Sequence, residues 1–235
     1  MKLVLFDVDG TLISTKGAGM RAFCRAMKQH FDVHVDDDAV RPDGKTDSLI
    51  LKELLCHCNL VERWCEETRD ALFSEYLSCL EEEMSQARNR GLIRVLPGVL
   101  DFLKNLGGQK DFAVGLVTGN LDKGAFTKLS HAGLDGFFRF GGYGSDSEDR
   151  TELTRVAIQR GTRLVAPEPV ESSFVIGDTP LDVLHGRAAG AYVIAVASAR
   201  YGMDDLASSN PDLLVSDMTS ADIIISFMRQ APGRK

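Results

Sequence analysis

Two pairs of acidic residues follow apolar segments at widely separated places in the chain. Asp7 and Asp9 end an apolar stretch near the N-terminus, and Asp178 and Asp182 follow the apolar segment 174–177. An ionised carboxylate at the end of a buried strand is costly unless it meets a cation or hydrogen-bond donors. The two-residue spacing can direct Asp7 and Asp9 to the same side, so that one attacks a substrate while the other exchanges a proton. A turn would explain Asp9 and helix capping would explain Asp178, but a turn leaves Asp7 unexplained.

The two acidic pairs together indicate a metal site. Hard oxygen ligands at the carboxyl ends of two strands are what Mg²⁺ prefers, with water or phosphate oxygens completing the octahedron. A third polar segment, Thr118-Gly119-Asn120, follows the apolar residues 112–117. Its hydroxyl, flexible backbone and amide can all donate to a phosphoryl oxygen, although Gly-Asn is also a common turn dipeptide.

The elements that must position these residues are buried parallel strands. Segments 3–8, 112–118 and 174–177 are continuous apolar runs, which are typical of parallel strands covered by helices on both faces. Helices are expected between them at 97–106, 150–160 and 180–190, and weaker strands at 137–140, 192–196 and 213–215. This alternation predicts an α/β fold with a doubly wound, mostly parallel sheet.

Residues 15–90 differ from the rest of the chain because their apolar residues recur with a 3.6-residue period and strand signals are scarce. We predict an all-helical cap over 15–90, inserted into an α/β core formed by 1–14 and 91–235. The insertion would begin and end near the carboxyl end of the sheet, where α/β proteins bind ligands. It could therefore act as a lid.

Composition and charge narrow the classes of partner. The chain has 235 residues, of which 44% are hydrophobic and 26% charged, as in ordinary globular proteins. Its net charge of -7 argues against non-specific binding to nucleic acid or to an anionic membrane. The longest uncharged stretch, 188–199, is too short to cross a bilayer. Five cysteines and no export signal favour reduced thiols in a cytoplasmic protein, and no zinc site is expected.

The three motifs, in their order along the chain, resemble those of the haloacid dehalogenase superfamily. They are Asp7-Val8-Asp9-Gly10-Thr11-Leu12, Thr118-Gly119-Asn120, and Gly177-Asp178-Thr179-Pro180-Leu181-Asp182. Leu96-Pro97-Gly98-Val99, which follows the insertion, is similar to the phosphoglycolate-phosphatase-like branch with a helical cap. The match in layout covers nearly the whole chain.

The resemblance implies roles for individual residues. Asp7 would be the nucleophile that forms an aspartyl-phosphate, and Asp9 the acid that protonates the leaving oxygen and then the base that activates water. Mg²⁺ would be held by the carboxylates of Asp7 and Asp178 and by the backbone carbonyl of Asp9. Asp182 would bind the metal directly or through a neighbouring ligand, and Thr118 would grip the phosphoryl group.

The family also uses a cation, usually Lys, between the second and the last motif. We expect Arg150, at the start of a predicted helix, to take this role, because an Arg can pair with carboxylate and phosphate in a bidentate way. Lys123 and Lys128 are alternatives, and Arg150 would otherwise be a solvated helix terminus.

Three further residues are expected to bind substrate. Gly119 and Asn120 adjoin Thr118, and Lys45 lies in a cap loop, 43–47, that the resemblance places opposite the active site. Lys45 would meet a carboxylate or a second phosphate of the substrate, or else be an exposed surface lysine. Its Gly-Lys-Thr segment does not follow a buried strand, so a P-loop is disfavoured.

These inferences predict a Mg²⁺-dependent phosphomonoester hydrolase that acts on a small phosphorylated metabolite through an aspartyl-phosphate. Phosphoglycolate is the expected substrate by family analogy alone. The alternatives are a phosphomutase of the same superfamily and a non-catalytic phosphate-binding or partner-binding protein on this fold. An intact Asp9 counts against a dehalogenase, which needs neither that acid nor a metal. The sequence says nothing about the oligomeric state.

Overall fold

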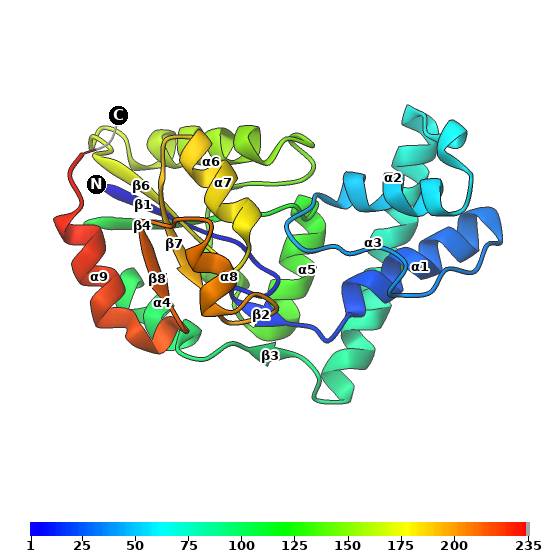
Figure 1. The fold of residues 1–235 in the computed structure, drawn as a ribbon, viewed down its shortest axis with the longest axis horizontal. Helices are drawn as coiled ribbons and strands as arrows, with labels where there is room; N and C mark the ends of the chain where they lie inside the picture. Colours follow the sequence, from blue (N-terminus) through cyan, green and yellow to red (C-terminus); the bar gives the residue numbers. More distant parts are fainter. Residues whose placement is uncertain (234–235) are drawn as a thin grey trace.

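The computed structural model describes residues 1–233, and a six-stranded sheet forms its centre (Figure 1). In spatial order the strands are β5 (Gly141–Gly142), β4 (Phe112–Val117), β1 (Lys2–Phe6), β6 (Ser172–Gly177), β7 (Tyr192–Val196) and β8 (Leu213–Val215). Each hydrogen-bonded pair among them is parallel. The predicted α/β fold with a doubly wound parallel sheet is therefore confirmed.

Helices cover both faces of the sheet. Within β1, Val4 and Phe6 belong to one buried cluster and Leu3 and Leu5 to another. The first cluster is completed by α4 (Val99–Gly107), α5 (Asp122–Ala132) and α9 (Ala221–Gln230). The second is completed by α6 (Arg150–Val165), α7 (Pro180–Ala188) and α8 (Met203–Ala207). Since side chains on both sides of the central strands are buried, these strands are apolar without alternation.

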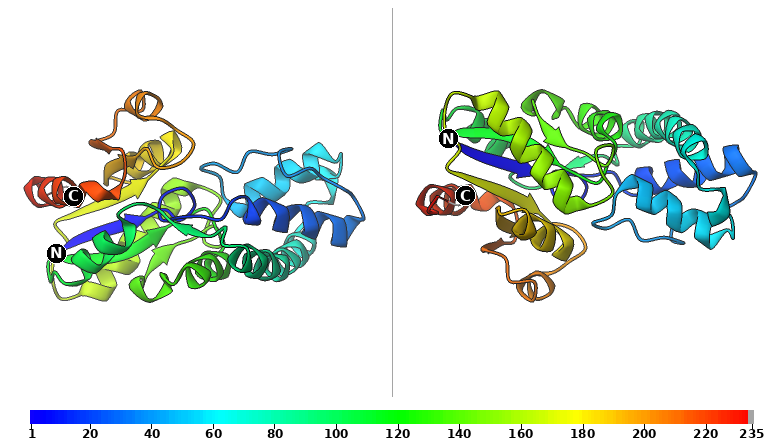
Figure 2. Two further views of the ribbon diagram at one scale, coloured as in Figure 1. Left: turned by 90° about the horizontal axis from the view of Figure 1, so that it is seen from below. Right: turned by 90° about the horizontal axis from the view of Figure 1, so that it is seen from above.

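A separate group of helices projects from one end of the sheet, as Figure 2 shows from two sides. In the described residues 15–90 all regular structure is helical: α1 (Ala18–Phe31), α2 (Asp47–His57), α3 (Glu66–Asn89) and one short 3₁₀ turn. These helices share a buried cluster of their own, in which Phe23 stacks on Tyr76. The chain leaves and re-enters the core through an antiparallel pair, β2 (Ile13–Ser14) with β3 (Arg94–Val95).

The strand expected at 137–140 is wrong. Residues Asp135–Phe137 form a 3₁₀ turn, and the edge strand is instead β5, which begins directly after residue 140. The aromatic residues that suggested a strand, Phe138 and Phe140, are buried but lie outside it, although the Phe140 carbonyl oxygen accepts from the backbone N–H of Leu116 in β4 at 3.0 Å. A glycine is needed in β5 because a Cβ on Gly142 would lie 1.9 Å from the carbonyl oxygen of Leu153 in α6.

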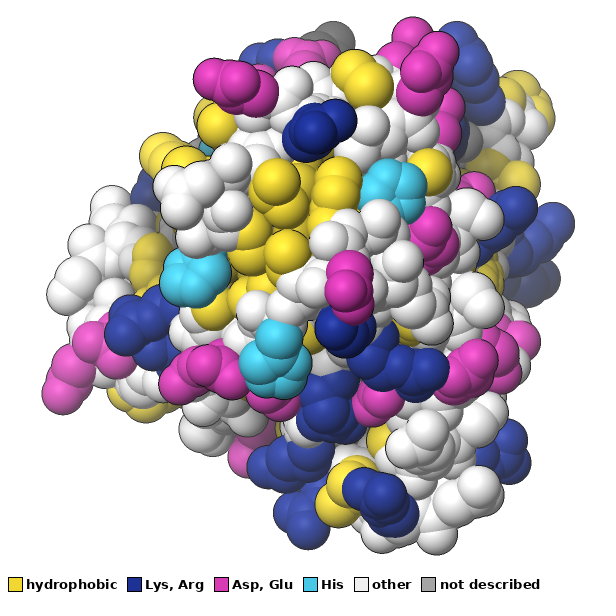
Figure 3. Space-filling model, turned by 90° about the vertical axis from the view of Figure 1, so that its right-hand side faces the viewer, with side chains coloured by type: hydrophobic (Ala, Val, Ile, Leu, Met, Phe, Trp, Pro, Cys, Tyr) yellow, Lys and Arg dark blue, Asp and Glu magenta, His cyan; other side chains and the backbone are white. Residues whose placement is uncertain are grey.

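The end of the molecule formed by α1–α3 carries charged side chains of both signs around a patch of hydrophobic side chains (Figure 3). A face of mixed charge is not a footprint for a polyanion such as nucleic acid. Within residues 1–233, no helix combines the length and the apolar character that a membrane span requires.

Candidate active site

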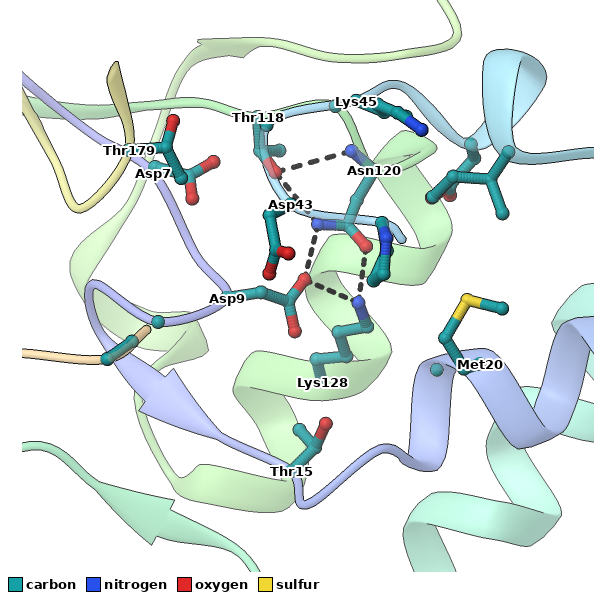
Figure 4. A pocket seen from close by; sticks show the side chains of 18 of the residues that line it. Asp7, Asp9, Thr15, Met20, Asp43, Lys45, Thr118, Asn120, Lys128 and Thr179 are labelled. Atoms are coloured by element: carbon teal, nitrogen blue, oxygen red, sulfur yellow. Dashed lines mark hydrogen bonds and ion pairs between the residues drawn. The ribbon is translucent and has the colours of Figure 1, made fainter. Parts of the chain in front are cut away.

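The carboxyl ends of β1, β4 and β6 border a cavity of about 270 Å³ between the sheet and helices α1–α3 (Figure 4). Parallel strands bring their carboxyl ends to one edge, so segments far apart in the chain meet there. From the core the cavity is lined by Asp7, Asp9, Thr118, Asn120, Lys128, Arg150 and Asp178. From the helical side it is lined by Met20, Phe23, Lys45, Asp47 and Ile50, among others.

Three buried carboxylates gather at the core side of this cavity. Asp7, Asp178 and Asp182 each offer an oxygen, and these oxygens lie within 4.8 Å of one another. Burial, with the charge of Asp182 next in importance, raises the pKa of Asp7 to about 7. Burial and the charges of Asp182 and Asp7 raise the pKa of Asp178 well above its usual value. Ionising all three would require a further cation, and their hard oxygen ligands fit Mg²⁺.

Asp182 holds its neighbours in place. It is the third residue of α7, and its Oδ2 accepts hydrogen bonds from the backbone N–H and the hydroxyl of Thr179, at 3.0 and 2.7 Å. Its Oδ1 accepts from Nη2 of Arg150 at 2.6 Å. Because both oxygens are engaged, this carboxylate is suited to orient Arg150 and the start of α7, and a metal would compete with those bonds.

The Asp9 carboxylate lies apart from this acidic group and points into the cavity, where its side chain is 43% exposed. Its Oδ2 accepts from Nδ2 of Asn120 at 2.8 Å and from Nζ of Lys128 at 2.5 Å. The side chain is thus oriented by two donors and open to a ligand, which is what an acid and base for a bound substrate requires.

The segment after β4 is a tightly bonded turn. Thr118 is fully buried, and its Oγ1 accepts from the backbone N–H of Asn120 at 3.3 Å and from Nδ2 of Asn120 at 2.8 Å. The Thr118 hydroxyl hydrogen is left to donate into the cavity. Asn120 also accepts from Nζ of Lys128 at 2.5 Å through its Oδ1.

Two buried cations reach the cavity from different helices. Arg150, the first residue of α6, donates from Nη2 to Asp182 and, at 3.3 Å, to Oδ1 of Asp7. Lys128, from α5, contacts Asp9 and Asn120 instead. Lys123, the third sequence candidate, is exposed. A signal for Lys128 existed in the sequence, because it shares the buried face of α5 with residues 124, 125 and 129.

Lys45 lines the cavity as part of the loop before α2, but its charge is already paired. Its Nζ donates to Oε2 of Glu53 at 2.5 Å, and its side chain is 27% exposed. The loop lies directly on the turn after β4: a Cβ on Gly119 would lie 2.0 Å from the carbonyl oxygen of Lys45. Gly119 therefore allows the backbone of this loop to pack directly against the turn.

Asp47 is a site residue that sequence reasoning placed only within a loop. It is the first residue of α2, 3% exposed, and its Oδ2 accepts from the backbone N–H of Leu121 at 2.8 Å. Burial raises the pKa of Asp47 to about 7, with the charge of Lys128 acting in the opposite direction. From the sequence alone, an acidic residue in the first turn of a helix looks like a partner for the helix dipole.

The chain is similar to known proteins over most of its length. A family model described as haloacid dehalogenase-like hydrolase matches residues 4–196. A pyrophosphatase PpaX from Anoxybacillus flavithermus is 24% identical over 217 residues, which cover 92% of this chain and 93% of the relative. A probable phosphatase, IndB, from Dickeya dadantii is 27% identical over 217 residues, covering 91% and 88%.

Solved structures share the fold over nearly the full length. A β-phosphoglucomutase from Clostridium difficile superimposes with a TM-score of 0.73 at 16% identity, covering 97% of each chain. A protein from Clostridium acetobutylicum described as a predicted phosphatase gives a TM-score of 0.70 at 18% identity, covering 96% of this chain and 98% of the other. At these identities the likeness concerns the fold.

Proposed function

The chain belongs to the haloacid dehalogenase-like hydrolase family, and on that premise we propose that it is a Mg²⁺-dependent phosphatase acting on a small phosphorylated metabolite. The observation that carries the proposal is the convergence of Asp7, Asp178 and Asp182 beside Arg150, in a cavity that Asp9 also lines. A nucleophile, an acid and base, and a place for a cation are the parts that phosphoryl transfer needs.

Asp7 would attack the phosphorus atom while the bond from phosphorus to the ester oxygen breaks, which leaves an aspartyl-phosphate. Asp9, protonated at that stage, gives its proton to the departing oxygen. It then takes a proton from a water molecule that attacks the phosphorus. The acyl-phosphate bond breaks, phosphate leaves, and Asp7 is regenerated.

Other side chains would hold the phosphoryl group and the nucleophile in place. Arg150 already donates to Asp7 and is placed to orient its attacking oxygen. The Thr118 hydroxyl and the backbone N–H of Gly119 would donate to phosphoryl oxygens. When bound by Asp7, Asp178 and the backbone carbonyl of Asp9, Mg²⁺ would offset the repulsion between an anionic nucleophile and an anionic substrate.

We propose that residues 15–90 act as a cap over this site and limit the substrate's size. Lys45, Asp47 and Ile50 close the cavity from the helical side, leaving about 270 Å³. That volume suits a short phosphorylated metabolite, and exclusion of bulk water would strengthen the electrostatic interactions inside. The antiparallel pair β2 and β3 joins the two parts and is placed to act as the hinge.

Pyrophosphate is a second candidate substrate. Several relatives whose similarity extends over more than 90% of this chain are named pyrophosphatases.

The proposed function is tested by measuring phosphate release, with Mg²⁺, from p-nitrophenyl phosphate, phosphoglycolate, pyrophosphate, hexose phosphates and nucleotides. We expect metal-dependent release that EDTA abolishes and that Asp7→Asn lowers by at least about 1,000-fold. Undiminished turnover by Asp7→Asn would exclude it as the nucleophile, and a rearranged hexose phosphate in place of free phosphate would indicate a mutase.

A further inference from the structure

Asp47 makes two hydrogen bonds that bracket Asn120. Its backbone N–H donates to the carbonyl oxygen of Gly119 at 2.8 Å, and its carboxylate accepts from the backbone N–H of Leu121 at 2.8 Å. The two partners are the residues on either side of Asn120, so a single residue of α2 grips this turn at both ends. Asp47 is 3% exposed, which shields both bonds from water.

Close packing of the two backbones keeps this grip in register. A Cβ on Gly119 would lie 2.0 Å from the carbonyl oxygen of Lys45 and 2.9 Å from Cα of Thr46. The N-terminus of α2 is itself fixed, because the Thr46 side chain accepts from the backbone N–H of Leu49 at 3.4 Å. The contact therefore joins an ordered helix start to the turn after β4.

The side chain held between these two bonds controls the position of Asp9. Nδ2 of Asn120 donates to Asp9 at 2.8 Å, and Oδ1 of Asn120 accepts from Lys128, which also donates to Asp9 (Figure 4). Asn120, Lys128 and Asp9 thus form a closed triangle of hydrogen bonds. A shift of the turn would move the amide and remove one of the two donors that orient the Asp9 carboxylate.

We infer that Asp47 is a positioning residue for the phosphatase reaction: by holding residues 119–121, it keeps Asn120 and Lys128 where they orient Asp9 toward the leaving oxygen. The inference rests on the proposed function, because it assigns Asp47 to the acid step of that reaction. Asp47 itself touches neither the nucleophile nor the expected ligands of the cation.

Leaving groups of different basicity separate this role from a general effect on folding. An alkoxide leaving from an alkyl phosphate needs a proton from Asp9, whereas p-nitrophenolate departs readily without one. A misplaced Asp9 should therefore lower kcat/KM, which reports formation of the aspartyl-phosphate, much more for an alkyl phosphate than for p-nitrophenyl phosphate. Hydrolysis of the aspartyl-phosphate, in which Asp9 acts as the base, is the same step for both esters and does not enter kcat/KM. A loosened cap would slow both alike.

The experiment compares Asp47→Ala, Asp47→Asn and Glu83→Gln with the unaltered protein, on glycerol phosphate and on p-nitrophenyl phosphate. Glu83 is the matched control, since it is a buried carboxylate of α3 whose partners, Arg21 and Arg25, lie within the helical unit. For Asp47→Ala we expect kcat/KM to fall by about 10- to 100-fold on glycerol phosphate and by less than about 3-fold on p-nitrophenyl phosphate. Asp47→Asn retains an acceptor for Leu121 and should lose less, while Glu83→Gln should change both rates by the same factor.

Amide hydrogen exchange gives a second readout that does not depend on turnover. Exchange of the segment 119–122 should speed up in Asp47→Ala and stay unchanged in Glu83→Gln. Equal loss of kcat/KM on both esters, or unchanged exchange in this segment, would overturn the inference and leave the phosphatase proposal intact. If the unaltered protein released phosphate from no ester, the proposed function itself would fail, and the inference with it.

Discussion

Nη2 of Arg150 lies 3.3 Å from Oδ1 of Asp7, although 143 residues separate the two in the chain. Both side chains are buried, with 6% and 8% of their surface exposed. The same nitrogen also donates to Asp182. One guanidinium thus faces several buried carboxylates, so Arg150 neutralises part of their charge and fixes the direction of the Asp7 side chain.

Removing Arg150 should therefore impair both phosphate capture and local folding. We expect Arg150→Ala to lower kcat/KM for p-nitrophenyl phosphate by about 100- to 1,000-fold, since it removes a charged donor to the phosphoryl group. The buried carboxylates left without this partner should also destabilise the fold, by about 3–5 kcal/mol. Arg150→Lys keeps the charge and should retain more activity. In Lys128→Ala, which leaves Asp7 untouched, the loss should depend on the leaving group. Near-normal kinetics in Arg150→Ala, with loss of phosphate binding in Lys128→Ala, would assign the phosphate-binding cation to Lys128.

Metal binding should depend on pH in a direction set by the carboxyl groups that take part. Burial raises the pKa of Asp7 to about 7 and that of Asp178 well above its usual value, so the metal-free site retains protons near neutrality. A divalent cation must displace them, and its affinity should rise between pH 6 and pH 8. In differential scanning fluorimetry, added Mg²⁺ should raise the Tm by more at pH 8 than at pH 6. An equal increase at both pH values, or a full shift in Asp178→Asn, would contradict this assignment.

Asp47 should make the protein less stable as the pH rises. Burial raises the pKa of Asp47 to about 7 in the folded protein, from an ordinary value of 3.8 in an unfolded chain, so the folded state holds the proton more tightly. This contribution is complete below about pH 4 and is lost as the pH passes 7, with a total on the order of 4 kcal/mol.

Asp47→Asn cannot ionise and still offers an oxygen to Leu121. The free energy of unfolding of Asp47→Asn, minus that of the unaltered protein, should therefore be larger at pH 8 than at pH 5 by roughly 2–3 kcal/mol. Urea unfolding at the two pH values measures this difference, and a constant difference would contradict it. Asp47→Asn would then be more stable but less active than the unaltered protein, so that Asp47 supports activity at a cost in stability.

Gly119 should tolerate no side chain, because a Cβ would collide with the carbonyl oxygen of Lys45. We expect Gly119→Ala to destabilise the protein by about 1–3 kcal/mol, or to hold the loop before α2 away from the turn, raising KM. Gly107 in α4 is a suitable control, since a Cβ there meets nothing within 4 Å. If Gly119→Ala and Gly107→Ala had the same free energy of unfolding and a normal KM, the close approach of Gly119 to the loop before α2 would not matter for stability or substrate binding.

The sequence by itself determined the sheet and the meeting of the acidic residues. The continuous apolar segments around Leu5, Leu116 and Val175 require strands that are buried on both faces, and such strands are parallel and end at a common edge. Asp7, Asp178 and Thr118 follow those strands directly, so their convergence could be foreseen without knowing any helix orientation. The strand expected at 137–140 was wrong because residues Asp135–Phe137 form a 3₁₀ turn, and the edge strand begins only at Gly141, where Gly142 packs closely against α6.

Only the tertiary structure decided which side chains complete the site. The pattern of α5 can place Lys128 on the buried face of that helix, but it is the docking of α5 that brings Lys128 beside Asp9 and leaves Lys123 exposed. Lys45 turns to Glu53, and Asp47 grips the turn after β4, because of how α2 meets the core. The physical reason is that a strand fixes where its end must lie, whereas the face of a helix that meets a site depends on contacts between segments far apart in the chain.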